Sequence, residues 1–157
     1  MKHLLLSIII SLGATSCVNS LFYYPDSISY QTPERYSLKY EDVFFHSRDN
    51  KTKLHGWFIP ARTEAQGTIL FFHGNAQNIS SHFSVVRLFP DAGFNVFIFD
   101  YRGYGRSQGD VGKKGIQLDC LAAIDYLKSK VNPHKIIIFG QSLGGNLALA
   151  ATAVHED

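Results

Sequence analysis

One serine in this sequence has neighbours that suit it for nucleophilic catalysis. Ser142 is centred in a Gly-x-Ser-x-Gly pattern formed with Gly140 and Gly144, after the apolar run 135–139 and before the helix-like stretch 146–154. A side chain at either glycine would crowd a turn tight enough to lift the serine hydroxyl clear of the backbone. The pattern therefore predicts an exposed nucleophile on a strand-to-helix turn.

Two further loops follow apolar runs in the same way. His73-Gly74-Asn75 comes directly after the run 68–72, and residues 100–107, with the sequence DYRGYGRS, follow the run 95–99. Acyl transfer by serine also needs hydrogen-bond donors for the developing oxyanion, which a loop after a strand can supply. Taken alone, the loop 73–75 is better explained as a tight turn that needs a glycine. Together with the serine turn, it favours the catalytic interpretation.

The elements that must position these loops are predicted from the hydrophobic pattern. Short apolar runs without alternation indicate strands that are buried on both faces. These runs are residues 68–72, 95–99 and 135–139. Upstream, residues 43–46 and 54–59 flank a polar turn and predict an antiparallel hairpin at a sheet edge.

Helices are expected between the buried strands. Apolar residues recur at helical spacing in two stretches, 79–86 and 116–127. Strand and helix therefore alternate along the chain, which predicts an α/β fold with a mostly parallel sheet, crossover helices and an N-terminal antiparallel hairpin. Cys120 falls on the apolar face of the second helix, where we expect a buried structural thiol.

With the loops 73–75, 100–107 and 140–144 in this order, the chain resembles the α/β-hydrolase superfamily, particularly its bacterial serine aminopeptidase-like and Bem46-like branches. The stretches 40–43 and 54–60 also look like the entry strands of that group. The resemblance runs from about residue 24 to the end of the chain. It implies a serine hydrolase that needs no cofactor.

The resemblance also implies roles for individual residues. The residue matching Ser142 is the nucleophile, and the N–H groups of Asn75 and Leu143 are the candidate oxyanion-hole pair. Four residues are expected to give structural support: His73, Gly74, Gly140 and Gly144. The loop that begins at Asp100 usually braces the site in this family, so Asp100 is not proposed as the triad acid.

In α/β-hydrolases the catalytic acid and histidine follow the serine in the chain. Only one helix is predicted after Ser142, so residues 41–157 match the N-terminal part of such a domain, an incomplete α/β-hydrolase fold. We expect either a piece of a longer hydrolase or a relic of one, nearly inactive as the sequence stands. The run 135–139 is expected to present an open, apolar strand edge.

The remaining histidines show no metal-ligand spacing, and no metal site is predicted. They are interpreted as surface or turn residues: His46, His55, His82, His134 and His155.

The N-terminus has the composition of an export signal. Lys2 precedes the almost uninterrupted apolar stretch 4–12, which small residues follow. About nine apolar residues are too few for a stable membrane-spanning helix, which needs roughly 20, so a membrane anchor through this stretch is the weaker alternative. Residues 1–16 are therefore predicted to be a signal peptide.

The small residues lead directly into Cys17, as in a bacterial lipobox, although Ala14 stands where leucine is usual. We expect Cys17 to be lipidated and residues 17–40 to form an irregular tether. The protein would then be exported and lipid-anchored in the bacterial cell envelope. An ordinary signal peptide with a nearby cysteine is the alternative.

Composition narrows the class of partner. The 157 residues are 45% hydrophobic and 18% charged, as in a domain that buries a core. The net charge is only +2 and no basic cluster alternates with aromatic residues, so nucleic acid is not expected as a partner. Two cysteines imply no disulfide framework. We expect a small-molecule or lipid-like acyl substrate; the alternative is a non-catalytic, hydrolase-like lipoprotein that acts as a binding module.

Overall fold

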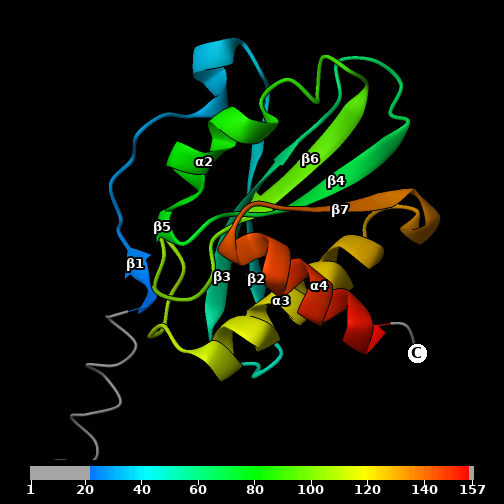
Figure 1. Ribbon diagram of the computed structural model, residues 1–157. Coiled ribbons are helices and arrows are strands. Elements are labelled where there is room, and N and C mark those ends of the chain that lie inside the picture. The colour runs from blue at the N-terminus through cyan, green and yellow to red at the C-terminus, as the bar shows by residue number, and fades with distance from the viewer. Residues whose placement is uncertain (1–21, 156–157) are drawn as a thin grey trace, which may run out of the picture.

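The computed structural model describes residues 22–155 (Figure 1). The predicted signal peptide, residues 1–16, and the predicted lipidation site Cys17 lie outside the described residues. The strands are β1 (Tyr24–Pro25), β2 (Glu41–His46), β3 (Lys53–Ile59), β4 (Gly67–Phe72), β5 (Ala76–Gln77), β6 (Phe94–Phe99) and β7 (Ile136–Gly140). The helices are α2 (Ile79–Val86), α3 (Lys113–Lys128) and α4 (Leu143–His155), with short 3-10 turns η1 (Pro33–Tyr36) and η2 (Pro133–Lys135).

The larger sheet has the strand order β2-β3-β6-β4-β7. The pairs β2–β3 and β3–β6 are antiparallel, whereas β6–β4 and β4–β7 are parallel. The predicted edge hairpin and the predicted crossovers are therefore confirmed, and the fold is α/β with a mixed sheet. Helix α4 begins at Leu143, earlier than the stretch 146–154 that the sequence pattern indicated.

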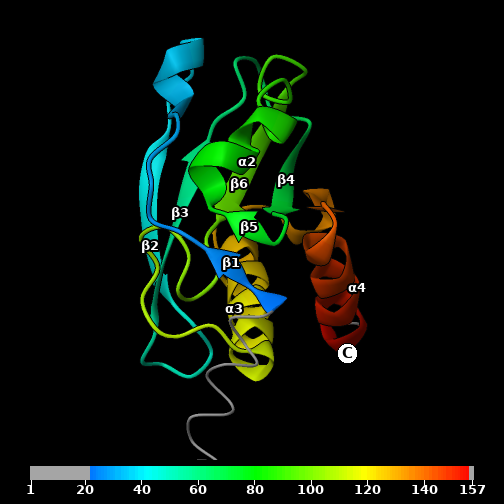
Figure 2. The ribbon, with the colours of Figure 1, turned by 60° about the vertical axis from the view of Figure 1, so that its left-hand side comes forward.

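The sheet is sandwiched between helices. Helix α2 covers one face, and α3 and α4 cover the other (Figures 1 and 2). All six residues of β4 are buried, as expected of a strand with neighbours on both sides and a helix on each face. Within the described residues β7 forms the edge of the sheet, and its side chains Ile137 and Phe139 are 47% and 37% exposed.

The segment before β2 is more closely attached to the domain than the expected tether. Most of residues 26–40 has no regular secondary structure, as predicted. However, β1 pairs with β5 in parallel, and Leu38 is buried in the cluster beneath α2. We call residues 22–30 the strap, because they run along the outer side of β5 (Figure 2). Among residues 22–155, no helix is both long and apolar enough to cross a membrane.

Candidate active site

Ser142 occupies the turn that joins β7 to α4. Strand β7 ends at Gly140 and α4 begins at Leu143, so only two residues make the connection. Ser142 is exposed, and its φ of 53° lies in the left-handed region that residues with side chains rarely adopt. Such strain in a non-glycine residue is typical of functional sites, and a nucleophile elbow requires this sharp strand-to-helix turn.

The two flanking glycines make the turn possible by close backbone packing. A Cβ atom at Gly140 would lie 2.6 Å from the carbonyl oxygen of Gly144. A Cβ atom at Gly144 would overlap the carbonyl oxygen of Phe72 at the end of β4. The N–H of Gln141 donates a hydrogen bond to that same oxygen at 3.0 Å. The elbow is thus fixed to the neighbouring strand, and neither glycine has room for a side chain.

The loop after β4 lies beside this elbow. Strands β4 and β7 are parallel neighbours with Phe72 opposite Gly140, so the residues that follow them lie at the same edge of the sheet. Asn75 is held there by the Tyr104 hydroxyl, which donates to its carbonyl oxygen at 2.7 Å. The Asn75 side-chain amide donates to the carbonyl oxygen of Phe22 at 2.6 Å. These contacts fix the backbone that carries one candidate oxyanion donor.

The other candidate donor belongs to helix α4. Leu143 is the first residue of the helix, and the first N–H groups of an α-helix have no acceptor within the helix itself. The helix dipole adds partial positive charge at the same end. Negative charge that develops beside Ser142 would therefore meet a favourable field.

His73 is wholly buried beneath the loop. Its Nδ1 lies 2.8 Å from the Gly74 carbonyl oxygen, and its ring packs on Tyr101 with 4.3 Å between ring centroids. Burial lowers the pKa of His73 to about 3, so the ring is neutral at physiological pH. This environment suits a structural residue and does not suit a general base, which must accept a proton and release it again.

His82 is partly exposed, in keeping with its interpretation as a surface residue, but it also contacts the candidate site. His82 lies in the first turn of α2, with Nδ1 2.9 Å from Oε1 of Gln141 and Nε2 2.8 Å from the Ala76 carbonyl oxygen. Its ring also stacks on that of His73. It therefore connects the residue before Ser142 with the loop that carries Asn75. Only tertiary structure brings these segments together, so nothing in the local sequence pattern identified it.

The interpretation of His55 as a surface or turn residue was wrong. It lies in β3 with 1% of its surface exposed, and its Nε2 is 2.6 Å from Oδ1 of Asp42. Its position inside the predicted strand 54–59 was the available signal, because a central strand buries both of its faces. His46 and His134 are exposed as expected, and the side chain of His155 lies outside the described part of the structure.

Asp100 braces the site from within. Its Oδ1 accepts a hydrogen bond from the Ile79 N–H at the start of α2, and its carbonyl oxygen accepts one from the Ser107 hydroxyl at 2.7 Å. The carboxyl group is buried, and burial raises its pKa. Asp100 thus connects the loop 100–107 with the first turn of α2.

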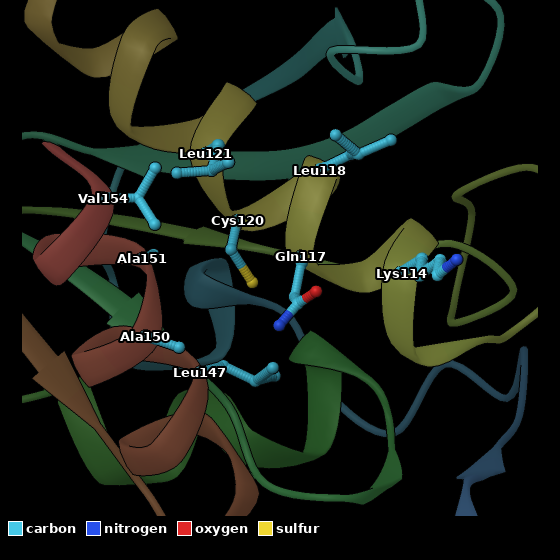
Figure 3. A pocket seen from close by; sticks show the side chains of 9 residues that line it. All are labelled: Lys114, Gln117, Leu118, Cys120, Leu121, Leu147, Ala150, Ala151 and Val154. Carbon is cyan, nitrogen blue, oxygen red and sulfur yellow. The ribbon is translucent and has the colours of Figure 1, made fainter.

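An apolar cavity between two helices lies away from the elbow. It has a volume of about 400 Å³ between α3 and α4, and residues from both helices line it (Figure 3). The Cys120 side chain points toward this space but is only 1% exposed, and burial raises its thiol pKa. The prediction of a buried structural thiol is confirmed. In residues 22–155, no group of three or more His, Cys, Asp or Glu residues is arranged to hold a metal ion.

Several known proteins are similar in sequence to this chain. A family model described as alpha/beta hydrolase fold matches residues 67–157. The uncharacterized protein YfhR of Salmonella typhi is 44% identical over 137 residues, covering 83% of this chain and 45% of the relative. The protein bem46 of Schizosaccharomyces pombe is 35% identical over 130 residues, covering 80% of this chain and 44% of the relative.

A solved structure agrees with the sequence relatives. The esterase Pf2001 of Pyrococcus furiosus superimposes with a TM-score of 0.68 at 31% identity, over 82% of this chain and 49% of that one. The chain therefore spans about half the length of the proteins it matches.

Proposed function

Because this chain belongs to the α/β-hydrolase superfamily, in its Bem46-like branch, we propose that it supplies the nucleophile of a serine hydrolase, Ser142. The substrate class is an ester, a thioester or an amide. The observation that carries the proposal is the strained, exposed turn at Ser142, with a φ of 53° between two glycines that have no room for a side chain.

The chemistry has two balanced steps. The Ser142 oxygen bonds to the substrate carbonyl carbon, and its proton passes through a general base to the departing alcohol, thiol or amine. Water then attacks the acyl-serine, releases the carboxylic acid and restores the hydroxyl. In both steps the carbonyl oxygen becomes negatively charged, and the N–H groups of Asn75 and Leu143 are proposed to stabilise it.

The general base is proposed to come from a different part of the whole protein. Among the described side chains, Ser142 forms no hydrogen bond with a histidine, and both ring nitrogens of His82 already have partners. Family order places the acid and the histidine after the serine. We therefore expect residues 1–157 alone to be nearly inactive, because removing such partners costs on the order of 10⁶ in kcat.

A fluorophosphonate probe tests the nucleophile directly. The natural full-length product should be labelled covalently, and Ser142→Ala should abolish labelling and hydrolysis of a short p-nitrophenyl ester. Ser84→Ala is a matched control, since Ser84 is exposed on the neighbouring helix α2. Equal labelling of the parent and Ser142→Ala would refute the assignment.

The same absence of a histidine partner also favours a second candidate function. The chain would then be a non-catalytic lipoprotein that keeps the hydrolase fold as a binding surface. A folded full-length protein that shows no labelling and no esterase activity would support this alternative.

We further propose that the protein is exported and anchored in the bacterial envelope through a lipidated Cys17. The support is the sequence pattern of residues 1–17. Metabolic labelling with a palmitate analogue should mark the parent and not Cys17→Ser. Labelling of both would refute the anchor.

A further inference from the structure

The strap is bonded directly to the loop that carries Asn75. Besides the bond from the Asn75 side chain to the Phe22 carbonyl oxygen, Tyr24 pairs with Ala76 and Pro25 with Gln77 in a parallel ladder. Figure 2 shows β1 on the outer side of β5. The N-terminal end of the described chain therefore lies at the edge of the sheet where the candidate site is built.

The strap is held along its whole length. Asn78 Nδ2 donates to Oδ1 of Asp26 at 2.6 Å, and the Gly105 N–H donates to the Asp26 carbonyl oxygen at 2.8 Å. Further along, the Tyr30 N–H donates to the Ser80 hydroxyl at 3.0 Å. Its path beside the loop that carries Asn75 and beside the start of α2 is therefore fixed by hydrogen bonds.

The strap also exposes large apolar and aromatic side chains. Phe22 is 62% exposed, Tyr24 57%, Ile28 59% and Tyr30 40%. The only charged residue in the strap is Asp26, and its carboxylate accepts bonds from Tyr30 and Asn78. Aromatic side chains with polar tips suit the boundary between lipid headgroups and acyl chains.

The residues that precede the strap indicate that a lipid bilayer contacts this surface. Phe22 is the fifth residue after Cys17, and five residues reach at most about 18 Å when fully extended. A lipid on Cys17 would therefore hold the strap within about 18 Å of the point where the acyl chains enter the bilayer.

We propose that the strap is a membrane-contact surface that holds the loop carrying Asn75 against the lipid. The preferred substrates are then acyl esters that reside in the bilayer, a statement that rests on the proposed hydrolase function. The membrane contact itself rests on the exposed side chains of the strap and on the proposed lipid at Cys17.

Vesicle binding tests the surface without the anchor. The full-length protein carrying Cys17→Ser should co-sediment with phosphatidylcholine vesicles. Adding Phe22→Ser and Ile28→Ser should lower the partition coefficient at least tenfold, because these side chains supply apolar area. Val85→Ser with Leu88→Ser is the matched control, since these residues are 39% and 61% exposed, Val85 in the last turn of α2 and Leu88 just after it.

The salt response separates this contact from electrostatic attraction. The strap contains no Lys or Arg, so it offers no positive charge to attract lipid headgroups. Vesicle binding should therefore be unchanged between about 0.1 and 0.5 M salt, although the Debye length falls below about 10 Å over this range. Failure to bind vesicles, or equal binding of the strap variant, would overturn the proposal, as would binding that disappears at high salt.

A soluble fluorophosphonate separates the membrane contact from the chemistry. Ile28→Ser alone leaves the contact between Phe22 and Asn75 untouched, so this variant should label at Ser142 as fast as its parent while cleaving a vesicle-embedded ester at least twofold more slowly. Slower labelling in solution would show that the side chains support the loop and would overturn the membrane assignment. An absence of labelling in every variant would refute the hydrolase function instead, and vesicle binding would still decide the surface.

Discussion

Gly144 lies against the carbonyl oxygen of Phe72, so closely that a Cβ atom at Gly144 would overlap it. The first turn of α4 is therefore in backbone contact with the end of β4, the strand that leads into the loop containing Asn75. The spacing between the turn at Ser142 and that loop is set by main-chain atoms. This contact explains why the pattern needs glycine two residues after the serine.

Gly144→Ala should lower the free energy of unfolding by about 3 kcal/mol, because the new methyl group pushes two backbone segments apart. Gly145→Ala is the control, since a Cβ there meets its nearest atom, the Gly140 oxygen, at 3.7 Å. Removing a helical glycine should stabilise the protein by roughly 0.5–1 kcal/mol. Urea unfolding checks both, and equal effects of the two substitutions would contradict the packing argument.

Asp119→Asn should be strongly destabilising. Asp119 is fully buried and accepts hydrogen bonds from Arg102, the shortest at 2.7 Å from Nη2, which join α3 to the loop 100–107. Arg102 keeps its ion pair with Asp49, but the buried end of the network loses its charge, a loss of about 3 kcal/mol. The exposed pair of Arg48 and Asp125 provides the comparison: Asp125→Asn should cost about 0.5 kcal/mol. Chemical denaturation of both variants measures the difference.

His73 should make stability fall in mild acid. The pKa of His73 is lowered to about 3 in the folded protein from an ordinary 6.5. Between pH 6.5 and pH 3, the unfolded chain therefore carries a proton on this ring that the folded protein lacks. The contribution of His73 to the free energy of unfolding is complete above pH 6.5 and decreases as the pH falls toward 3. Between pH 6.5 and pH 5 this one group accounts for about 2 kcal/mol.

His73→Asn should remove that part of the pH dependence. His134→Gln, which changes an exposed histidine, should keep it. Asp100 and His82 face the same ring, so the comparison is made as a difference between variant and parent at each pH. Denaturant midpoints at pH 7, 6 and 5 provide the measurement, and parallel curves for parent and His73→Asn would contradict it.

His82→Ala should slow labelling of Ser142 in the full-length protein by about tenfold or more, because the elbow and the loop lose their shared partner. His82→Gln should restore part of the rate if its amide reaches either Gln141 or Ala76. Ser84→Ala, two residues along the same helix, should have no effect. Labelling of His82→Ala at the parental rate would show that His82 has no positioning role.

Much of the fold could be predicted because it depends on local pattern. Strands β4 and β6 were visible as unbroken apolar runs, and β2 and β3 as runs on either side of a polar turn. The start of α4 was placed too late, because the elbow residue passes straight into the helix and leaves no separate capping segment. The pairing of β1 with β5 could not be predicted, because two-residue strands carry no periodicity.

The sequence by itself determined the turn at Ser142, the alternation of the longer strands and helices, and the buried thiol of Cys120, since spacing and hydrophobicity encode these directly. The tertiary structure decided the partners of His55 and His82 and the position of the strap beside Asn75. These relationships join segments that are distant in the chain, and one histidine has the same local pattern whether its ring is solvated or buried. Contacts of that kind exist only after the sheet has brought the segments together.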